Sequence, residues 1–207
     1  MTLSVDLDIG LHALGLQVPK DAKDKLLGFI ALLLKWNRVY NLTALRSPEA
    51  VLAGHILDSL SVLPHLPAGA LVDVGSGGGL PGIPLAICEP SRSVTLLESN
   101  QKKSSFQRQA TIELGLHNVQ VVCERAEVFR PAEGFQVVIS RAFSSMADFV
   151  NVSGHLCAVS GRFAAMKGIY PASEISKLPP LFHVEQSIAL DVPGVKGARH
   201  LILIRPS

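Results

Sequence analysis

The segment ALVDVGSGGGLPG, residues 70–82, decides the fold of this chain. A short apolar run ends at Asp73, and glycines follow at positions 75, 77, 78 and 79. Glycine adopts positive φ and lets backbone approach a ligand closely, so the pattern predicts a buried strand and then a cofactor loop. A carboxylate two residues before the first glycine would repel the phosphates of a dinucleotide. It suits a cationic sulfonium and amino group, so we expect S-adenosylmethionine (SAM).

Downstream of this loop, short apolar runs alternate with helical segments. This alternation is the βαβ rhythm of a parallel, Rossmann-like sheet. Two last runs, 182–190 and 199–204, are separated by proline and glycines and predict an antiparallel pair. The other predicted strands cover residues 70–74, 93–97, 119–123, 135–140 and 161–166, with helices near 80–89, 100–115 and 146–158.

The residues before the loop are predicted to be helical. Leucines at 3, 7, 11 and 14 recur at helical spacing, and a second amphipathic stretch covers 26–34. Ser47-Pro48-Glu49 is typical of a helix start, and a third helix runs through 55–63. We expect a helical N-terminal extension, residues 1–66, packed on a catalytic domain of residues 67–207.

Composition sets further limits. The 207 residues are 48% hydrophobic and 17% charged, typical of one globular unit that folds by itself. A net charge of +2 weakens a claim of RNA binding without excluding it. No apolar stretch approaches the roughly 20 residues of a membrane span, and no signal peptide is visible, so we expect a cytoplasmic protein. The three cysteines are far apart, which predicts buried, reduced thiols, and the histidines show no metal-ligand spacing.

The carboxyl ends of the predicted strands should converge, because ligands of parallel sheets collect there. These ends carry Asp73 to Gly79, Glu98, residues 123–127, residues 140–143, and Lys167. Glu98 lies 23 residues after Gly75, near the interval at which an acid accepts hydrogen bonds from ribose. Gly77-x-Gly79-x-x-Gly82 also satisfies the dinucleotide fingerprint, so an NAD(P)-dependent oxidoreductase stays an alternative.

Several segments together resemble the bacterial RsmG (GidB) family. They are the glycine loop, WNRVYNLT at 36–43, HILDS at 55–59 and SRAF at 140–143, and the likeness runs from about residue 30 to the C-terminus. The resemblance implies a class I methyltransferase fold and methyl transfer from SAM to N7 of a guanosine in 16S rRNA. It also implies a monomer that acts on rRNA, as naked RNA or within a ribosomal subunit. A non-catalytic ribosome-binding protein with a relic SAM pocket is the other alternative.

The resemblance also assigns site residues. It implies cofactor contacts at Gly75, Leu80, Ala126, Glu127 and Arg141, and four of these, all but Leu80, already lie at predicted strand ends. Arg141 is the candidate catalytic residue, holding the methionine carboxylate, the guanine edge or a phosphate; its structural alternative is an ion pair with Glu127 or Asp148. The complete expected cofactor set is Asp73, Gly75, Gly77, Leu80, Glu98, Ala126, Glu127 and Arg141.

Substrate contacts are expected at Asn37, Asn41, His55, Arg125 and Lys167. Asn37 and Asn41 are four residues apart, which places them on one helix face. The alternative for these asparagines and His55 is that they join the helices to the catalytic domain through buried hydrogen bonds. Trp36 and Phe143 could stack on a base, although isolated aromatics are more often in the core.

The absence of two motifs limits which atom of a base this protein could methylate. No proline-cysteine loop follows the fourth predicted strand, as methylation of cytosine C5 would need. SRAF stands where methylation of an exocyclic amine would require Asp or Asn, two prolines and an aromatic residue. Guanine N7 already carries an in-plane lone pair and no proton, so alignment with the methyl donor can suffice. We therefore predict no general base and no metal.

Overall fold

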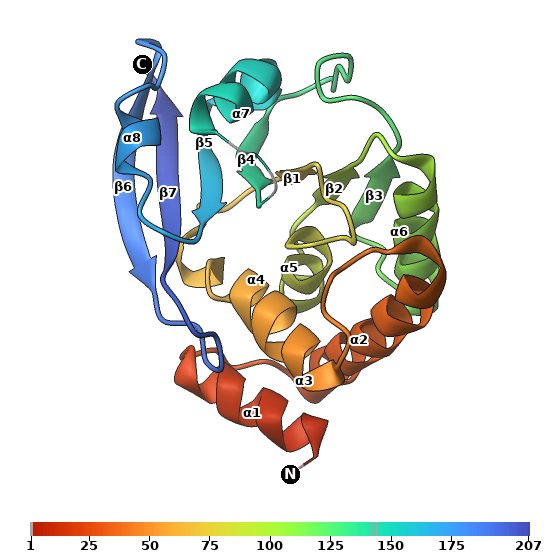
Figure 1. The fold of residues 1–207 in the computed structure, drawn as a ribbon. Helices are drawn as coiled ribbons and strands as arrows, with labels where there is room; N and C mark the ends of the chain where they lie inside the picture. Colours follow the sequence, from red (N-terminus) through yellow and green to blue (C-terminus); the bar gives the residue numbers. More distant parts are fainter. Residues whose placement is uncertain (1, 142, 144) are drawn as a thin grey trace.

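A mainly parallel sheet runs through the centre of the protein (Figure 1). The computed structural model describes residues 2–141, 143 and 145–207, and within them seven strands have the order β3-β2-β1-β4-β5-β7-β6. Neighbouring strands are parallel except β7, which is antiparallel to β5 and β6. The strands are β1 (Leu71–Val74), β2 (Val94–Leu97), β3 (Val119–Val122), β4 (Phe135–Ser140), β5 (Cys157–Lys167), β6 (Phe182–Leu190) and β7 (Arg199–Pro206).

Helices precede and separate the strands. Within the N-terminal part, α3, the π-helical η1 and α4 follow one another without a break, and Ser47 caps their start by accepting a hydrogen bond from Ala50 N at 3.2 Å. The helices are α1 (Leu3–Ala13), α2 (Lys20–Tyr40), α3 (Pro48–Val51), η1 (Leu52–Leu57), α4 (Asp58–Leu60), η2 (Leu63–His65), α5 (Gly82–Cys88), α6 (Gln101–Glu113), α7 (Met146–Ser153), η3 (Gly154–Leu156) and α8 (Ala172–Ile175).

The predicted strand order along the chain is confirmed, with three boundaries corrected. The helix expected to reach residue 158 ends at Ser153, and β5 begins at Cys157 instead of residue 161. The first four residues of β5, 157–160, are half-buried or exposed and none is fully buried, and the β4–β5 register shifts between Phe135 and Val137. The third N-terminal helix ends at Leu60, before the expected residue 63, where Ser61 Oγ donates to the Asp58 carbonyl at 2.7 Å.

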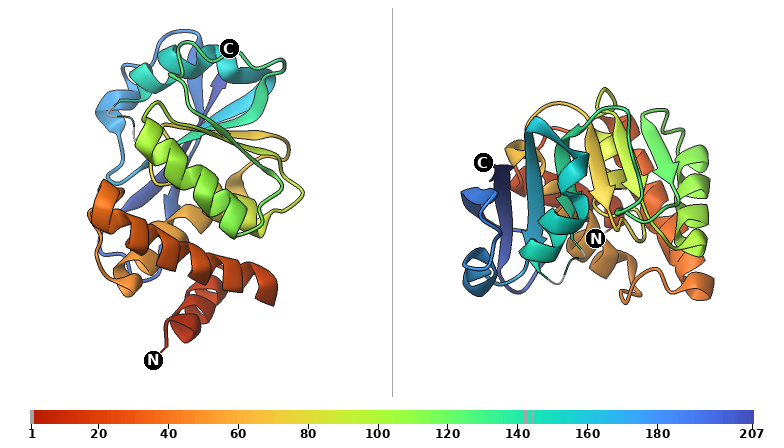
Figure 2. Two further views of the ribbon diagram at one scale, coloured as in Figure 1. Left: turned by 90° about the vertical axis from the view of Figure 1, so that its right-hand side faces the viewer. Right: turned by 90° about the horizontal axis from the view of Figure 1, so that it is seen from above.

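One face of the sheet and the N-terminal helices share a single hydrophobic core. Leu7, Leu33 and Ile56 from the helices pack in the same cluster as Leu96 and Ile139 from the sheet. Figure 2 shows α2 beside α5 and α6 on this side. We therefore propose that residues 1–66 are an extension of the catalytic unit, because their apolar side chains are buried against it.

The opposite face of the sheet is covered by α7. Phe149 of α7 packs on Phe163 of β5 with ring centroids 5.6 Å apart, and both rings are fully buried. Strand residues alternate between the two clusters, as the pleat requires: Leu71 faces the N-terminal helices and Val72 faces α7. No helix among the described residues is both long and apolar enough to cross a membrane.

The expectation of three buried thiols is met only in part, because Cys88 and Cys157 are half-buried and Cys123 is not buried. All three cysteines are free, but Cys123 is exposed, because it follows β3, at the edge of the sheet. Burial raises the pKa of Cys88 to about 12 and that of Cys157 to about 11. These two thiols are protonated at neutral pH.

Candidate active site

The glycine loop after β1 is fixed by hydrogen bonds from two neighbouring elements. Gly75 and Gly77 have φ values of 71° and 54°, which favour glycine. Glu98, after β2, accepts from Gly77 N and from Asn100 N, each at 2.8 Å. Gln107 of α6 donates to the Gly77 carbonyl and to Ser76 Oγ, also at 2.8 Å. The loop is therefore held in shape by the chain itself.

Asp73, in β1 directly before the loop, links the two ends of the loop. Its side chain is fully buried, and Oδ2 accepts a hydrogen bond from Gly82 N at 2.8 Å at the start of α5. Oδ1 has no partner among the described residues. Burial raises the pKa of Asp73 to about 7, although the Gly82 hydrogen bond lowers it. Asp73 does not line the neighbouring pocket, so we assign it to shaping the loop rather than to the direct contact expected from the sequence.

A pocket of about 180 Å³ lies at the carboxyl ends of β1 to β4, where the strand order changes direction. The sequence-predicted residues Gly75, Arg125, Ala126 and Glu127 meet there. Phe143 belongs to the same wall, so the ring considered for base stacking faces this pocket. The other lining residues are Val74, Leu97, Ser99, Glu124 and Val152.

The lining explains what this pocket can hold. Apolar side chains form walls suited to a flat aromatic ring, and Glu124 and Glu127 supply acceptors for hydroxyl groups. Arg125 is the single lysine or arginine among the described lining residues, so nothing here favours a pyrophosphate. These apolar walls and carboxylate acceptors suit SAM, and they do not suit the pyrophosphate of NAD(P).

Only three of the eight expected cofactor residues, Gly75, Ala126 and Glu127, line this pocket. Asp73, Gly77 and Glu98 instead form or support the loop beside it, and Leu80 and Arg141 lie elsewhere. Leu80 is only 5% exposed and packs in the core, while its backbone N donates to the Ser76 carbonyl at 3.0 Å. Arg141 leaves the end of β4 on the other side of the loop and lines a second pocket of about 350 Å³. That pocket also receives Gly54, Asp58, Met166, Lys167, Gly168, Leu190, Arg199 and His200.

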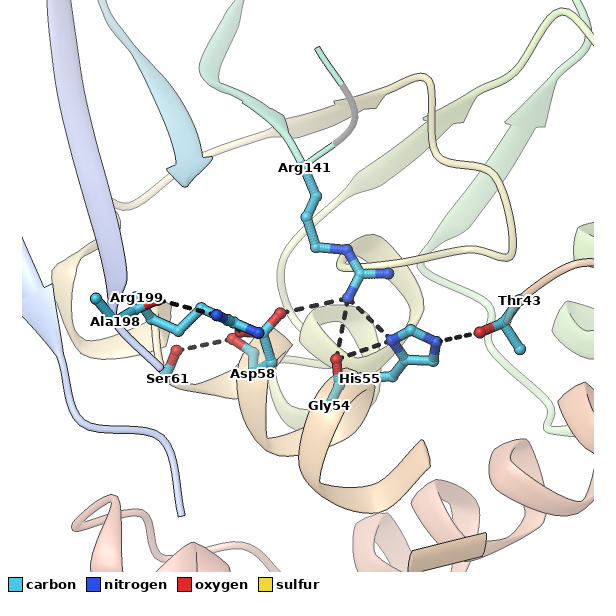
Figure 3. A network of polar contacts seen from close by, with 8 residues as sticks. All are labelled: Thr43, Gly54, His55, Asp58, Ser61, Arg141, Ala198 and Arg199. Carbon is cyan, nitrogen blue, oxygen red and sulfur yellow. Dashed lines mark hydrogen bonds and ion pairs between the residues drawn. The ribbon is translucent and has the colours of Figure 1, made fainter. Parts of the chain in front are cut away.

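Arg141 forms its ion pair with the helical extension. Its Nη1 lies 3.3 Å from Asp58 Oδ2, 3.1 Å from His55 Nδ1 and 3.4 Å from the Gly54 carbonyl (Figure 3). The alternative partners inferred from sequence, Glu127 and Asp148, are wrong, because the side chain extends toward η1 and α4. Ala142, which follows Arg141 in SRAF, lies outside the described residues.

His55 secures this contact. Its Nε2 lies 2.6 Å from Thr43 Oγ1 and its Nδ1 lies 2.8 Å from the Gly54 carbonyl. Burial, and then the Arg141 charge, lower the pKa of His55 to about 4, so the ring is neutral near pH 7. A neutral imidazole carries no charge that would repel the neighbouring guanidinium, and its one proton can lie on Nδ1, donating to the Gly54 carbonyl. The structural alternative for His55 is therefore supported.

The two asparagines have local roles. Asn37 is buried, accepts from Thr43 N at 2.9 Å and donates to the Leu45 carbonyl at 3.3 Å, which closes the segment after α2. Asn41 lies beyond the helix, at its left-handed C-cap with φ of 50°. The expected shared helix face is therefore wrong, since asparagine at this cap ends the helix.

Lys167 and Trp36 are also partly engaged within the protein. Lys167 Nζ lies 2.8 Å from Glu174 Oε2 and donates to the Phe143 carbonyl at 3.1 Å. It lines the second pocket while holding the segment after β4. Trp36 stacks on Tyr40 and packs near Phe106, with centroids 5.3 and 5.7 Å apart. Its ring therefore belongs to the packing of α2 on α6.

The sheet order and the glycine loop with its SAM-compatible pocket define a class I SAM-dependent methyltransferase, which confirms the expected fold class. Solved structures share this fold. TrmN from Thermus thermophilus has a TM-score of 0.59 at 20% identity and is matched over 83% of this chain and 53% of its own. A predicted O-methyltransferase from Agrobacterium tumefaciens has a TM-score of 0.58 at 18% identity, over 74% and 81%.

Sequence comparison identifies the family. The family model described as "rRNA small subunit methyltransferase G" matches residues 22–202. Proteins named "Ribosomal RNA small subunit methyltransferase G" are 50% identical in Nitrosospira multiformis, over 99% of this chain and 98% of the relative, and 53% identical in Aromatoleum aromaticum, over 96% of each. The chain belongs to this family and is a SAM-dependent methyltransferase of small-subunit rRNA. The resemblance inferred from the motifs is confirmed.

Proposed function

We propose that this protein transfers the methyl group of SAM to N7 of a guanosine in 16S rRNA. The observation that carries this proposal is the composition of the Arg141 pocket. Its described lining has no cysteine; its one carboxylate, Asp58, is bridged to two arginines, and its one histidine, His200, has Nδ1 2.8 Å from the Gly168 carbonyl. Guanine N7 needs no deprotonation, so a pocket that only orients the base suffices.

We assign SAM to the pocket lined by Gly75, Ala126 and Glu127, the cofactor pocket, and the target nucleotide to the pocket lined by Arg141, the acceptor pocket. The residues that would hold SAM are Gly75 and Gly77 through the loop backbone, Glu98 toward the ribose, and Ala126 with Glu127 beside the adenine. Bound SAM supplies an electrophilic methyl group. Glu98 can keep its two backbone hydrogen bonds and still accept more, because each carboxylate oxygen has further lone-pair capacity. Leu80 and Asp73 would act through loop shape.

The second pocket is the proposed acceptor side. Arg141 follows β4 beside the glycine loop, and Lys167 ends the neighbouring strand β5, so both would face the bound nucleotide. Arg125 lies exposed on the rim of the cofactor pocket, from which it would contact RNA. Asn37, Asn41 and His55 would support this side by fixing the segments around it.

The proposed setting is cytoplasmic, with a monomer acting on 16S rRNA within a ribosomal subunit or an assembly intermediate. The modest net charge of +2 supports this choice. A protein that binds naked RNA through its phosphates alone needs a wide basic surface, whereas a structured particle offers contacts of other kinds.

Arg141→Ala tests the assignment. 16S rRNA from a strain lacking this modification is incubated with SAM and each enzyme, then digested and analysed by nucleoside mass spectrometry. The wild type should form one N7-methylguanosine, and Arg141→Ala should form none while it keeps its circular dichroism spectrum. Arg162→Ala is the matched control, because Arg162 is paired with Glu185 on a different part of the sheet.

Three outcomes would contradict the proposal. Methylation at another atom by the wild type would reject N7. Full activity of Arg141→Ala would reject the role of that arginine. SAM binding by the wild type without any methyl transfer to subunits or to naked 16S rRNA would favour a relic pocket.

A further inference from the structure

A buried carboxylate on the helical extension joins two arginines from distant parts of the chain. The Asp58 side chain is 5% exposed. Its Oδ2 lies 3.3 Å from Arg141 Nη1, and its Oδ1 lies 3.0 Å from Arg199 Nε. Asp58 begins α4, Arg141 follows β4 and Arg199 begins β7 (Figure 3). Each carboxylate oxygen therefore fixes one guanidinium, and the pair is held at a common wall of the acceptor pocket.

Positive charge is in excess in this pocket. Arg141, Lys167 and Arg199 line it together with the single carboxylate of Asp58. Glu174 neutralises Lys167 from outside the lining, and His55 next to Arg141 is neutral near pH 7. His200 is the other titratable group of the lining, and its Nδ1 lies 2.8 Å from the Gly168 carbonyl. At least one positive charge is left for a ligand, so the pocket favours an anion.

The two arginines keep donors for that anion. Arg141 uses only Nη1 in its hydrogen bonds with described residues, so Nε and Nη2 stay available there. Arg199 uses Nε for Asp58 and Nη1 for the Ala198 carbonyl, which leaves Nη2. Their side chains are 26% and 33% exposed, enough to be reached from solvent. Guanidinium groups match the oxygens of a phosphate in charge and geometry.

A phosphate fits this chemistry better than the guanine base. The commonest contact of arginine with guanine donates to O6 and N7. Such a contact would occupy the N7 lone pair that must attack the methyl group. A backbone phosphate next to the target nucleotide leaves that lone pair free.

We propose that Asp58 is a positioning residue that holds Arg141 and Arg199 as a pair for one backbone phosphate beside the target guanosine. This inference rests on the proposed function. It assigns the rRNA contact of the acceptor pocket to phosphate, and it gives the N-terminal extension a part in substrate binding.

Asp58→Asn tests the positioning role, because the amide keeps the size of the side chain and removes its charge. Ribosomal subunits from a strain lacking the modification serve as substrate. Asp58→Asn should raise KM for subunits about tenfold, the equivalent of one charge-assisted hydrogen bond, with Kd for SAM unchanged. Glu185→Gln is the matched control, since Glu185 also joins two arginines, Arg162 and Arg205, away from both pockets. It should leave KM unchanged.

Arg199→Gln tests the phosphate directly. Binding of subunits is measured at several salt concentrations, and loss of one phosphate contact should lower the slope of log affinity against log salt by about one. If Asp58→Asn does not fold, as judged by circular dichroism, the Arg199→Gln salt slope still decides the phosphate assignment.

Distinct results would overturn the inference. Wild-type KM in Asp58→Asn would reject the positioning role, and so would an equal loss of SAM affinity, because that marks a general structural defect. An unchanged salt slope in Arg199→Gln, with reduced kcat, would place that arginine on the base. A wild-type enzyme that methylates no 16S rRNA would instead refute the proposed function itself.

Discussion

As pH rises, the wild type should lose stability that an Asp73→Asn variant keeps. The free energy of unfolding of the variant, relative to that of the wild type, should therefore increase with pH. The carboxyl group is fully buried, and its pKa is raised from 3.8 to about 7, chiefly by burial. The folded protein therefore binds the acidic proton more tightly than the unfolded chain does. The resulting stability is fully present below pH 3.8 and is lost as pH rises through about 7. An asparagine side chain does not titrate and escapes this loss.

The magnitude follows from the two pKa values. Their difference corresponds to about 4 kcal/mol when ionisation is complete in both states. Part of this loss of about 4 kcal/mol occurs below pH 5. Between pH 5 and pH 8, the free energy of unfolding of the variant should therefore rise by about 2 to 3 kcal/mol relative to that of the wild type. The amide can still accept from Gly82 N. Any cost of its buried NH2 group is the same at each pH, so only the pH dependence is diagnostic.

Urea unfolding followed by circular dichroism at pH 5, 6, 7 and 8 measures the effect. Asp24→Asn, the same substitution at an exposed position on α2, is the matched control and should run parallel to the wild type. If the free energies of unfolding of Asp73→Asn and the wild type differ by a constant amount over this range, Asp73 does not titrate there. The account of a carboxyl held near its ionisation point by burial would then be refuted.

Two further outcomes are expected. Glu98→Ala releases the N–H groups of Gly77 and Asn100 and should weaken SAM binding at least about tenfold; an unchanged Kd by calorimetry would reject both the ribose and the loop-fixing roles. Phe106→Ala removes a fully buried ring that packs on Phe29 and Trp36 and should cost about 3 to 5 kcal/mol of stability. A wild-type urea midpoint would contradict that packing.

The fold was predictable because its signals are local. Each βα unit carries its own apolar run and helix period, and the glycines after Asp73 mark where the first strand ends. The β5 boundary was missed because the first four residues of the strand, 157–160, are half-buried or exposed and lie beside a register shift in the pairing with β4. Hydrophobic periodicity is a clear signal only where residues alternate between fully buried and exposed positions, and residues 157–160 do not alternate in this way.

The site was predictable only as far as topology alone determines it. Gly75, Ala126 and Glu127 meet because parallel strands end at one edge. Asp58 and Arg199 meet across 141 positions of sequence, through the way the extension docks on the sheet. No spacing rule reports such a contact, although an aspartate within the apolar run HILDSLSVL was a signal of a buried partner. Val152 of α7 carried no signal at all, since it looks like any other core residue.

The core shared by the N-terminal helices and the sheet limits how this enzyme can change. Leu33 and Ile56 pack with Leu96, and the same extension supplies Gly54 and Asp58 to the acceptor pocket. The N-terminal extension therefore cannot be replaced by another RNA-binding segment while the catalytic domain stays unchanged. Substitutions that adapt the protein to another RNA must also preserve the packing that keeps it folded, so specificity and stability are expected to evolve together.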